Sequence, residues 1–368
     1  MQMSSQTELA YLTAARNGDS QRFAELAEPY RRELRAYCYR LMGSLEDAED
    51  LVQETMLRAW RRLETFEGRA SFRAWLYKIA TNACLDMLEK ASRRGLPTTR
   101  LSPANPDAAL PAMSSDPVWL DPFPDEWLDE TTPSAEARYI LQESVSLAFM
   151  TALQVLPPHQ RTVLVLRDVL DWHASEVAEF LDMTLSAVNS ALHRARTSLA
   201  KQQYMPQKGT AITVDEETRS LLERYVQAWE ATDVAGFVAL LKEDATFSMP
   251  PYPAWFQQRE AIAAFFRSSV FVEGNRWRLR PIHVSGQVGF AAYQYDAASD
   301  KYQAHAIHVL ELDASDVSSL TAFMNPALFP YFGLPDTLDI RSHEPVLPAH
   351  DSHDENLYRF AGQLRLGG

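Results

Sequence analysis

The segments DAEDLVQETMLRAW (residues 47–60) and FEGRASFRAWLYKIATNACLD (residues 66–86) decide the fold of the first part of the chain. From the first segment to Leu63, core-forming residues recur at helical spacing: Ala48, Leu51, Val52, Thr55, Met56, Ala59, Trp60 and Leu63. Ser44 followed by Asp47 predicts where this helix begins. Its outer face carries acids early and bases late, as the helix dipole favours. That face is either a solvated surface or a docking surface for a partner, and periodicity alone does not choose.

The second segment alternates aromatic with basic side chains. The aromatic residues are Phe66, Phe72, Trp75 and Tyr77, and the basic ones are Arg69, Arg73 and Lys78. Rings that stack on bases, beside cations that neutralise phosphates, suit single-stranded nucleic acid. The same rings could instead form the hydrophobic core of the domain. Spacing alone leaves both interpretations open.

Together the two segments resemble region 2 of the extracytoplasmic-function (ECF) group of sigma-70-family RNA polymerase sigma factors. In that family the acidic helix docks on the clamp helices of the polymerase, and the next segment opens the −10 promoter element and captures a flipped base. The resemblance implies that the residues in contact with core polymerase are Asp47, Asp50, Gln53, Glu54 and Leu57. It implies that the −10 DNA contacts are Phe66, Arg69, Ser71, Phe72, Arg73, Lys78 and Asn82.

Residues 156–199, LPPHQRTVLVLRDVLDWHASEVAEFLDMTLSAVNSALHRARTSL, have the pattern of a helix-turn-helix. Prolines open the first helix, Asp182-Met183 form the turn, and Thr184 or Ser186 caps the last helix. We expect the inward side of that helix to be Leu185, Val188, Leu192, Ala195 and Leu199. No acid occurs from 183 to 204, and amide, hydroxyl and guanidinium groups can contact bases and phosphates. DNA binding is therefore favoured over a protein-interaction module.

This second segment resembles region 4 of the same sigma factors, which reads the −35 element. The resemblance, together with the outer face, places −35 DNA contacts at Ser186, Asn189, Ser190, His193, Arg194 and Arg196. Asp182 stands where the family commonly has glycine, but aspartate tolerates a left-handed backbone. Asn189 and Ala191 stand where basic residues are frequent, so we expect weaker anchoring to phosphate.

The segment between the two helical regions has eight prolines from 97 to 133 and reads as a linker. Its apolar residues predict docking on an apolar surface: Trp119, Leu120, Phe123, Trp127 and Leu128. The family resemblance implies a path through the polymerase channel. Docking on the C-terminal domain of the same chain is the alternative, and a plain solvated spacer is the third interpretation.

Beyond residue 215 the pattern predicts an α+β domain, with helices at 216–231 and 234–241 and strands at 276–285, 288–295, 303–313 and 316–324. It resembles the SnoaL-like group of cone-shaped folds, and FMNPALFPYFGLP (323–335) resembles the end of that domain in sigma factors that carry it. Such a cone encloses a cavity for a small-molecule ligand. Candidate cavity residues are Trp255, Phe256, Tyr293, His305 and His308, and His283 and Asp296 are further acid–base candidates.

Catalysis in this cone is not expected, because no convincing Asp/Tyr or Asp/His set is evident. His305 and His308 are three residues apart, so alternation along a strand predicts opposite faces and only one of them in the cone. We therefore predict a regulatory domain that is not an enzyme, and we assign no catalytic residue, metal or cofactor.

The net charge of −14 over 368 residues argues against a basic DNA-coating protein. The charges are segregated, however: residues 58–100 hold ten bases and four acids, whereas residues 107–143 hold one base and nine acids. We expect the free chain to bind DNA weakly. Two cysteines, Cys38 and Cys84, are expected to be buried thiols. Without a run of about 20 apolar residues or a basic leader, we expect a cytoplasmic protein with no membrane partner.

These patterns predict a multidomain chain of two all-α domains and an α+β domain, and the resemblances imply that the first two are sigma domains and the third a cone-shaped SnoaL-like domain. The predicted parts are region 2 (8–94), an acidic linker (95–136), region 4 (137–204), the SnoaL-like domain (212–340) and a tail (341–368). The predicted function is transcription initiation, with the β and β′ subunits of core RNA polymerase and promoter DNA as partners. The alternative is a SnoaL-like enzyme or ligand-sensing DNA-binding regulator that does not need polymerase.

Overall fold

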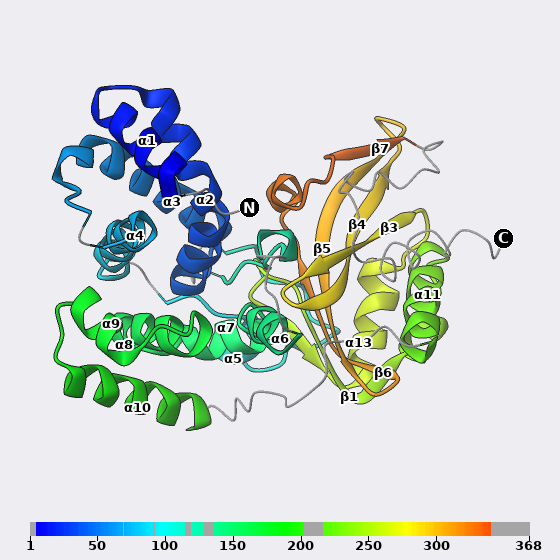
Figure 1. Ribbon diagram of the computed structural model, residues 1–368. Helices are drawn as coiled ribbons and strands as arrows, with labels where there is room; N and C mark the ends of the chain where they lie inside the picture. The colour runs from blue at the N-terminus through cyan, green and yellow to red at the C-terminus, as the bar shows by residue number, and fades with distance from the viewer. Residues whose placement is uncertain are drawn as a thin grey trace. The chain divides into compact units, whose positions relative to one another are not determined.

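A computed structural model of the chain describes residues 5–68, 70–90, 93–114, 119–128, 135–201 and 216–339. It divides into two compact units. The helical unit comprises residues 1–94 and 125–208, and the second unit comprises residues 95–124 and 209–368. The multidomain fold class is as expected, with helical domains followed by an α+β domain (Figure 1). The predicted tail, 341–368, lies outside the described residues.

The first part of the helical unit is a bundle whose helix ends follow from their capping residues. Its elements are α1 (Ser5–Arg16), α2 (Ser20–Met42), α3 (Leu45–Arg61), the 3₁₀ turn η1 (Leu63–Thr65) and α4 (Phe72–Leu88). Gly43 ends α2 with a φ of 73°, and the Ser44 hydroxyl then accepts from the Asp47 amide at 3.4 Å, as predicted. Cys38 and Cys84 are buried free thiols in this bundle, which confirms that expectation.

The second part of the helical unit contains the helix-turn-helix. Its elements are η2 (Asp125–Trp127), α6 (Ala135–Glu143), α7 (Leu147–Gln154), α8 (Pro158–Leu164), its π-helical extension η3 (Val165–Val169), α9 (Ala174–Phe180) and α10 (Leu185–Lys201). Asp182 has a φ of 55°, which confirms the left-handed turn without glycine. The Thr184 hydroxyl accepts from the Ala187 amide at 3.1 Å and caps α10.

The second unit is built on a sheet with strand order β2-β1-β6-β5-β4-β3, and β7 pairs with β5. The strands are β1 (Leu241–Ser248), β2 (Trp255–Gln257), β3 (Trp277–Val284), β4 (Gln287–Asp296), β5 (Lys301–Asp313), β6 (Asp316–Phe323) and β7 (Thr337–Asp339). The helical elements are α5 (Pro97–Arg100), α11 (Glu216–Glu230), α12 (Val234–Val238), α13 (Arg259–Phe265), η4 (Phe266–Val270) and η5 (Pro326–Phe332). Helices α11 and α13 lie against the sheet (Figure 1).

Aromatic side chains fill the space between these helices and the sheet. Phe237 of α12 stacks on Phe266 at 4.3 Å, and both are fully buried. Trp229 of α11 contacts Phe266 and Trp277 at 5.5 Å each. The space between these helices and the sheet is therefore largely filled by hydrophobic core.

Candidate nucleic-acid interface

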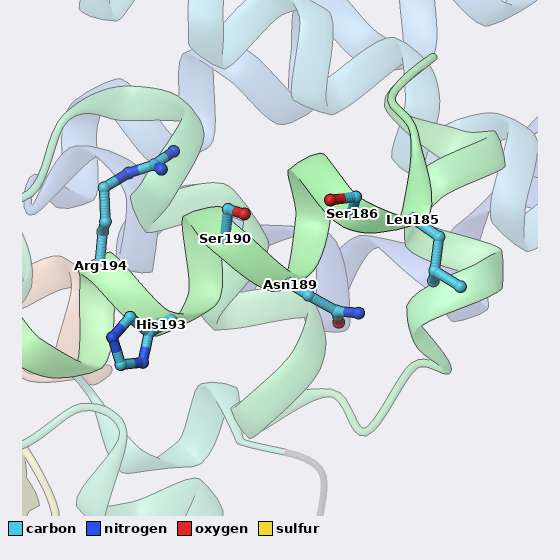
Figure 2. Close-up of a pocket in the computed structure, with 6 residues that line it drawn as sticks. All are labelled: Leu185, Ser186, Asn189, Ser190, His193 and Arg194. Atoms are coloured by element: carbon cyan, nitrogen blue, oxygen red, sulfur yellow. The ribbon is translucent and has the colours of Figure 1, made fainter.

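The outer face of α10 carries a row of exposed polar side chains above a buried apolar side. Val188, Ala195 and Leu199 are buried, whereas every predicted −35 residue is exposed: Ser186, Asn189, Ser190, His193, Arg194 and Arg196. The first five of these, with Leu185, line a shallow hollow of about 610 Å³. Figure 2 shows all six side chains projecting from this one helix. A helix with such a face can enter the major groove.

Two residues on α10 differ from expectation. Leu185, predicted to face inward, is 50% exposed and lines the hollow, because it is the first residue of the helix and has no preceding turn to pack on. Ala191 is buried. A basic residue at that position would therefore face the core, so Ala191 does not account for weaker phosphate anchoring.

The two arginines of the row have different surroundings. Arg196 donates to both carboxylate oxygens of Asp168, at 2.7 and 2.9 Å. Arg194 makes no ion pair with any residue that the structure describes. Arg194 is therefore the cation of this face that is available to phosphate without first breaking a contact.

On α3, the predicted polymerase-contact residues fall into two groups. Asp50, Gln53 and Leu57 are exposed at helical spacing, and Leu57 is unusually exposed for an apolar residue, at 42%. Asp47 and Glu54 are half-buried and already paired, with Arg94 and Arg58 respectively, at 2.6 Å each. Fewer residues of this face are therefore free to contact a partner than the sequence indicated.

The aromatic residues predicted to contact the −10 strand are packed together. Phe66 and Phe72 are buried, with ring centroids 5.8 Å apart, and Trp75 lies 5.1 Å from Phe66. Phe23 of α2 contacts Phe72 at 6.4 Å. In this arrangement the rings belong to the hydrophobic core of the bundle, which is one of the two interpretations that the spacing left open. Arg69 lies outside the described residues.

The polar members of the −10 set are placed differently from one another. Ser71 caps α4, accepting from the Ala74 amide at 3.1 Å, and Asn82 is exposed. Arg73 is held by Glu33, with contacts of 2.8 to 3.0 Å, and this pairing raises the pKa of the Arg73 guanidinium against the effect of burial. Lys78 contacts Asp182 in the helix-turn-helix at 2.6 Å and also donates to the Phe180 carbonyl.

Two buried arginines that the sequence analysis missed join the two parts of the helical unit. Arg161 of α8 donates to the carbonyl of Leu41 on α2 and to the Gln154 side chain at 2.9 Å. Arg40 of α2 donates to the Ser144 hydroxyl at 2.9 Å. Burial lowers the pKa of each guanidinium to about 10. The sequence held one signal of this buried contact, because Arg161 lies just before the apolar residues of α8.

The linker residues 95–124 dock on the C-terminal domain of the same unit. Trp119, Leu120 and Phe123 are buried. Phe123 and Ser285 exchange two hydrogen bonds, at 2.8 and 2.9 Å, and the Trp255 indole donates to the Leu101 carbonyl at 2.9 Å. The described part of this segment therefore favours the intramolecular alternative. Trp127 belongs to the helical unit, where the Arg35 guanidinium lies 5.4 Å from its ring.

The prediction that His305 and His308 lie on opposite faces is wrong. The pairing of β4 with β5 passes from Ala292–Ala306 to Tyr293–Ala304, so His305 is an extra, unpaired residue on β5. Such a bulge breaks the simple alternation. His305 contacts Trp277 at 4.9 Å and His308 contacts Trp229 at 4.6 Å, so both adjoin the same pair of tryptophans.

Burial lowers the pKa of His305 to about 4 and that of His308 to about 3. His308 is fully buried, and its Nδ1 lies 3.1 Å from the Tyr225 hydroxyl. Both imidazoles are therefore neutral near pH 7. The Trp277 indole N–H is buried and has no hydrogen-bond partner among the described residues.

The other cavity candidates do not join these histidines. Tyr293 packs on Phe329 at 5.1 Å and donates to the Pro335 carbonyl at 3.0 Å. Trp255 is bound by the linker, and Phe256 is a core residue. Of the acid–base candidates, His283 is exposed and Asp296 accepts from Ser299 in a turn. The predicted set is thus dispersed.

Within the described ranges, no group of His, Cys, Asp and Glu side chains could hold a metal ion. In those same ranges, none of the helices is long and apolar enough to cross a membrane.

Three stretches of the chain match known families. Residues 26–94 match Sigma-70 region 2, residues 146–199 match Sigma-70, region 4, and residues 222–318 match the SnoaL-like domain. The chain is 44% identical over 328 residues to the ECF RNA polymerase sigma factor SigG of Mycobacterium tuberculosis, covering 88% of this chain and 86% of that protein.

Similarity extends to other sigma factors. The chain is 31% identical over 221 residues to the ECF RNA polymerase sigma factor SigJ of Mycobacterium tuberculosis, covering 60% of this chain and 62% of that protein. The crystal structure of the same SigJ aligns with a TM-score of 0.50 and 23% identity, over 84% of this chain and 98% of that chain. This structural similarity supports the fold described here, with helical domains followed by an α+β domain.

Proposed function

This chain belongs to the ECF group of sigma-70-family RNA polymerase sigma factors. We propose which of its surfaces bind core polymerase and which bind promoter DNA. Sigma factors bind core RNA polymerase and direct it to promoter DNA. We assign polymerase docking to α3, −10 melting to residues 66–82, and −35 recognition to α10. A sigma factor acts with the polymerase, so we place the chain in the cytoplasm.

The exposed polar face of α10 is the observation that carries this proposal. A recognition helix places its N-terminal residues against base edges. Ser186 and Asn189 are in the first two turns of α10, so we assign them to base contacts. Arg194 lies further along and is assigned to a phosphate. Because Asp168 holds Arg196, we assign Arg196 a lesser part in DNA contact.

On α3 we propose that Asp50, Gln53 and Leu57 make the first contacts with the β′ and β subunits, since they are exposed on one face. Asp47 and Glu54 contribute after exchanging their present partners. Replacing Asp50→Arg should weaken binding to core polymerase by at least tenfold in a competition assay. Glu273→Arg makes the same charge change on an exposed residue of the C-terminal domain and should leave binding unchanged. Equal effects of the two variants would contradict the assignment.

For −10 melting we propose that Ser71, Arg73, Lys78 and Asn82 contact the strand, with Arg69 as a further member from its position in the sequence. Phe66 and Phe72 can take part only after their cluster opens, because both rings are buried. A fluorescent base analogue in the −10 element would report strand opening. Asn82→Ala, which alters an exposed side chain, should slow opening without changing the stability of the bundle.

For the SnoaL-like domain we propose a regulatory role, exerted through the linker that it holds. Neither His305 nor His308 has a carboxylate partner among the described residues, and a histidine with a pKa of about 3 is a poor acid–base catalyst near pH 7. The test is Phe123→Ala, which loosens the linker from this domain. We expect transcription to change by at least threefold, whereas Leu110→Ala, at a linker residue that is 36% exposed, should have no effect.

A small-molecule ligand of the cone remains a separate proposal. The buried Trp277 N–H, which lacks an acceptor among the described residues, and the neighbouring His305 support a ligand that offers a hydrogen-bond acceptor. A metabolite screen by thermal shift tests it. Trp277→Phe keeps an aromatic ring and removes the N–H donor, so it should abolish the thermal shift caused by a ligand that accepts from this N–H.

A further inference from the structure

The side chains that line the hollow on α10 lie in two rows along the helix (Figure 2). Residues four positions apart share one side of a helix, so the rows are Leu185, Asn189 and His193, and Ser186, Ser190 and Arg194. Five of the six residues offer polar groups. Leu185 is the exception, because its aliphatic side chain has no hydrogen-bonding group, and it stands at the end of the row that contains Asn189.

The exposure of Leu185 is set by the point at which α10 begins. The Thr184 hydroxyl accepts from the Ala187 amide at 3.1 Å, which caps the helix and makes Leu185 its first residue. The buried side of α10 begins at Val188, almost one turn later. Leu185 is therefore held 50% exposed. A single exposed leucine is ordinary on a protein surface, so its neighbours decide what it can contact.

Those neighbours place Leu185 beside a base-reading residue. The rise of about 1.5 Å per residue puts Leu185 and Asn189 about 6 Å apart along the axis of α10. Base pairs are stacked about 3.4 Å apart, so the two side chains reach base pairs within about two steps of each other. No carboxylate occurs from 183 to 204 to repel the phosphates on either side. Leu185 is thus an apolar group that enters the groove together with Asn189.

The major groove offers one apolar group to such a side chain, which is the C5-methyl group of thymine. We propose that Leu185 is a specificity-determining residue that packs against a thymine methyl group of the −35 element, within about two base pairs of the base that Asn189 contacts. The contact depends on the proposed assignment of α10 to the −35 element. It removes the leucine and the methyl group from water together, and unmodified cytosine, adenine and guanine present no methyl group in its place.

Replacement of thymidine by deoxyuridine tests the contact, because it deletes the methyl group and leaves the hydrogen-bonding groups of the base pair unchanged. Each thymine of the −35 element, on either strand, is replaced in turn in a promoter selected from a library with the holoenzyme of chain and core polymerase. Binding is measured by competition with the unsubstituted promoter. We expect one position at which deoxyuridine weakens binding about fourfold, which corresponds to about 0.8 kcal/mol for one buried carbon group.

Three variants show whether Leu185 makes this contact. Leu185→Ala should bind the thymine and uracil promoters equally, and alanine favours the helix, so α10 keeps its start. Leu185→Met keeps an apolar side chain and should retain most of the difference between the promoters. Leu9→Ala removes a leucine that is 64% exposed on α1, so it is the matched control and should retain the full difference.

The possible failures are distinguishable. The Leu185 contact is overturned if the holoenzyme distinguishes an intact −35 element from a base-substituted one, yet deoxyuridine has no effect at any thymine or has the same effect with Leu185→Ala. The assignment of α10 then still stands. A holoenzyme that is indifferent to every base pair of the −35 element instead refutes the assignment of α10, and the Leu185 contact fails with it.

Discussion

Replacing Arg194→Ala tests whether the outer face of α10 meets DNA. The Arg194 guanidinium is exposed and makes no ion pair with the described residues, so its removal costs the helix little stability. If it contacts one phosphate, its loss weakens promoter binding by about 1–2 kcal/mol, roughly 5- to 30-fold. The loss should be the same whatever the −35 sequence, because a phosphate contact carries no sequence information.

Salt dependence sharpens this prediction. Each phosphate neutralised adds about 0.9 to the slope of log affinity against log salt concentration, so the variant's slope should be shallower by that amount. Between about 50 and 200 mM salt, the difference between variant and unaltered chain should then shrink roughly 3.5-fold. The assay is fluorescence anisotropy of labelled promoter DNA with the holoenzyme of chain and core polymerase.

Arg196→Ala is the matched control for this experiment, because Asp168 holds its guanidinium at 2.7 Å. We expect a smaller change in slope from this variant. An Arg194→Ala holoenzyme with unaltered affinity and an unaltered slope would refute the phosphate assignment, and with it the orientation of α10 on DNA.

Three further predictions concern specificity and stability. Asn189→Ala should cost about 1–3 kcal/mol of discrimination between an intact and a substituted −35 element, measured by competition between the two promoters; equal loss on both would contradict base reading. Phe266→Ala, which empties a fully buried site stacked on Phe237 at 4.3 Å, should destabilise the C-terminal domain by about 3–5 kcal/mol in urea unfolding, and a cost below about 1 kcal/mol would contradict the packing. Because burial lowers the pKa values of His305 and His308 from 6.5 to about 4 and about 3, the unfolded domain binds more protons below pH 6.5. The domain should therefore be fully stable above about pH 6.5 and lose up to about 1.4 kcal/mol per pH unit per histidine as pH falls towards 4, and His308→Asn should remove about half of that slope.

Local features of the fold could be read from the sequence because they depend on neighbouring residues. The caps at Ser44 and Thr184 and the left-handed turn at Asp182 are decided within a few positions, and the structure has each as expected. The C-terminal helices were predicted at 216–231 and 234–241 and observed as Glu216–Glu230 and Val234–Val238. Strand β1 was missed, because three consecutive charged residues, Lys242 to Asp244, interrupt its apolar alternation.

Features that depend on residues far apart in the sequence could not be predicted from local patterns. The bulge at His305 has no local sequence signal, and it reversed the expected relation of the two histidines. Lys78 and Asp182 are 104 positions apart, so their pairing follows only from the packing of the helices. The linker's apolar residues predicted a dock, but Ser285 and Trp255, which hold it, were identifiable only from the fold.

Reconstituted transcription tests the central claim most directly. Purified chain and core RNA polymerase would be incubated with a promoter library, and transcripts would be mapped and quantified. We predict transcripts that require the chain, that share one −10 and one −35 sequence, and that weaken when Asn189 or Asp50 is replaced. No chain-dependent transcript, together with tight binding of the isolated chain to duplex DNA, would contradict the account.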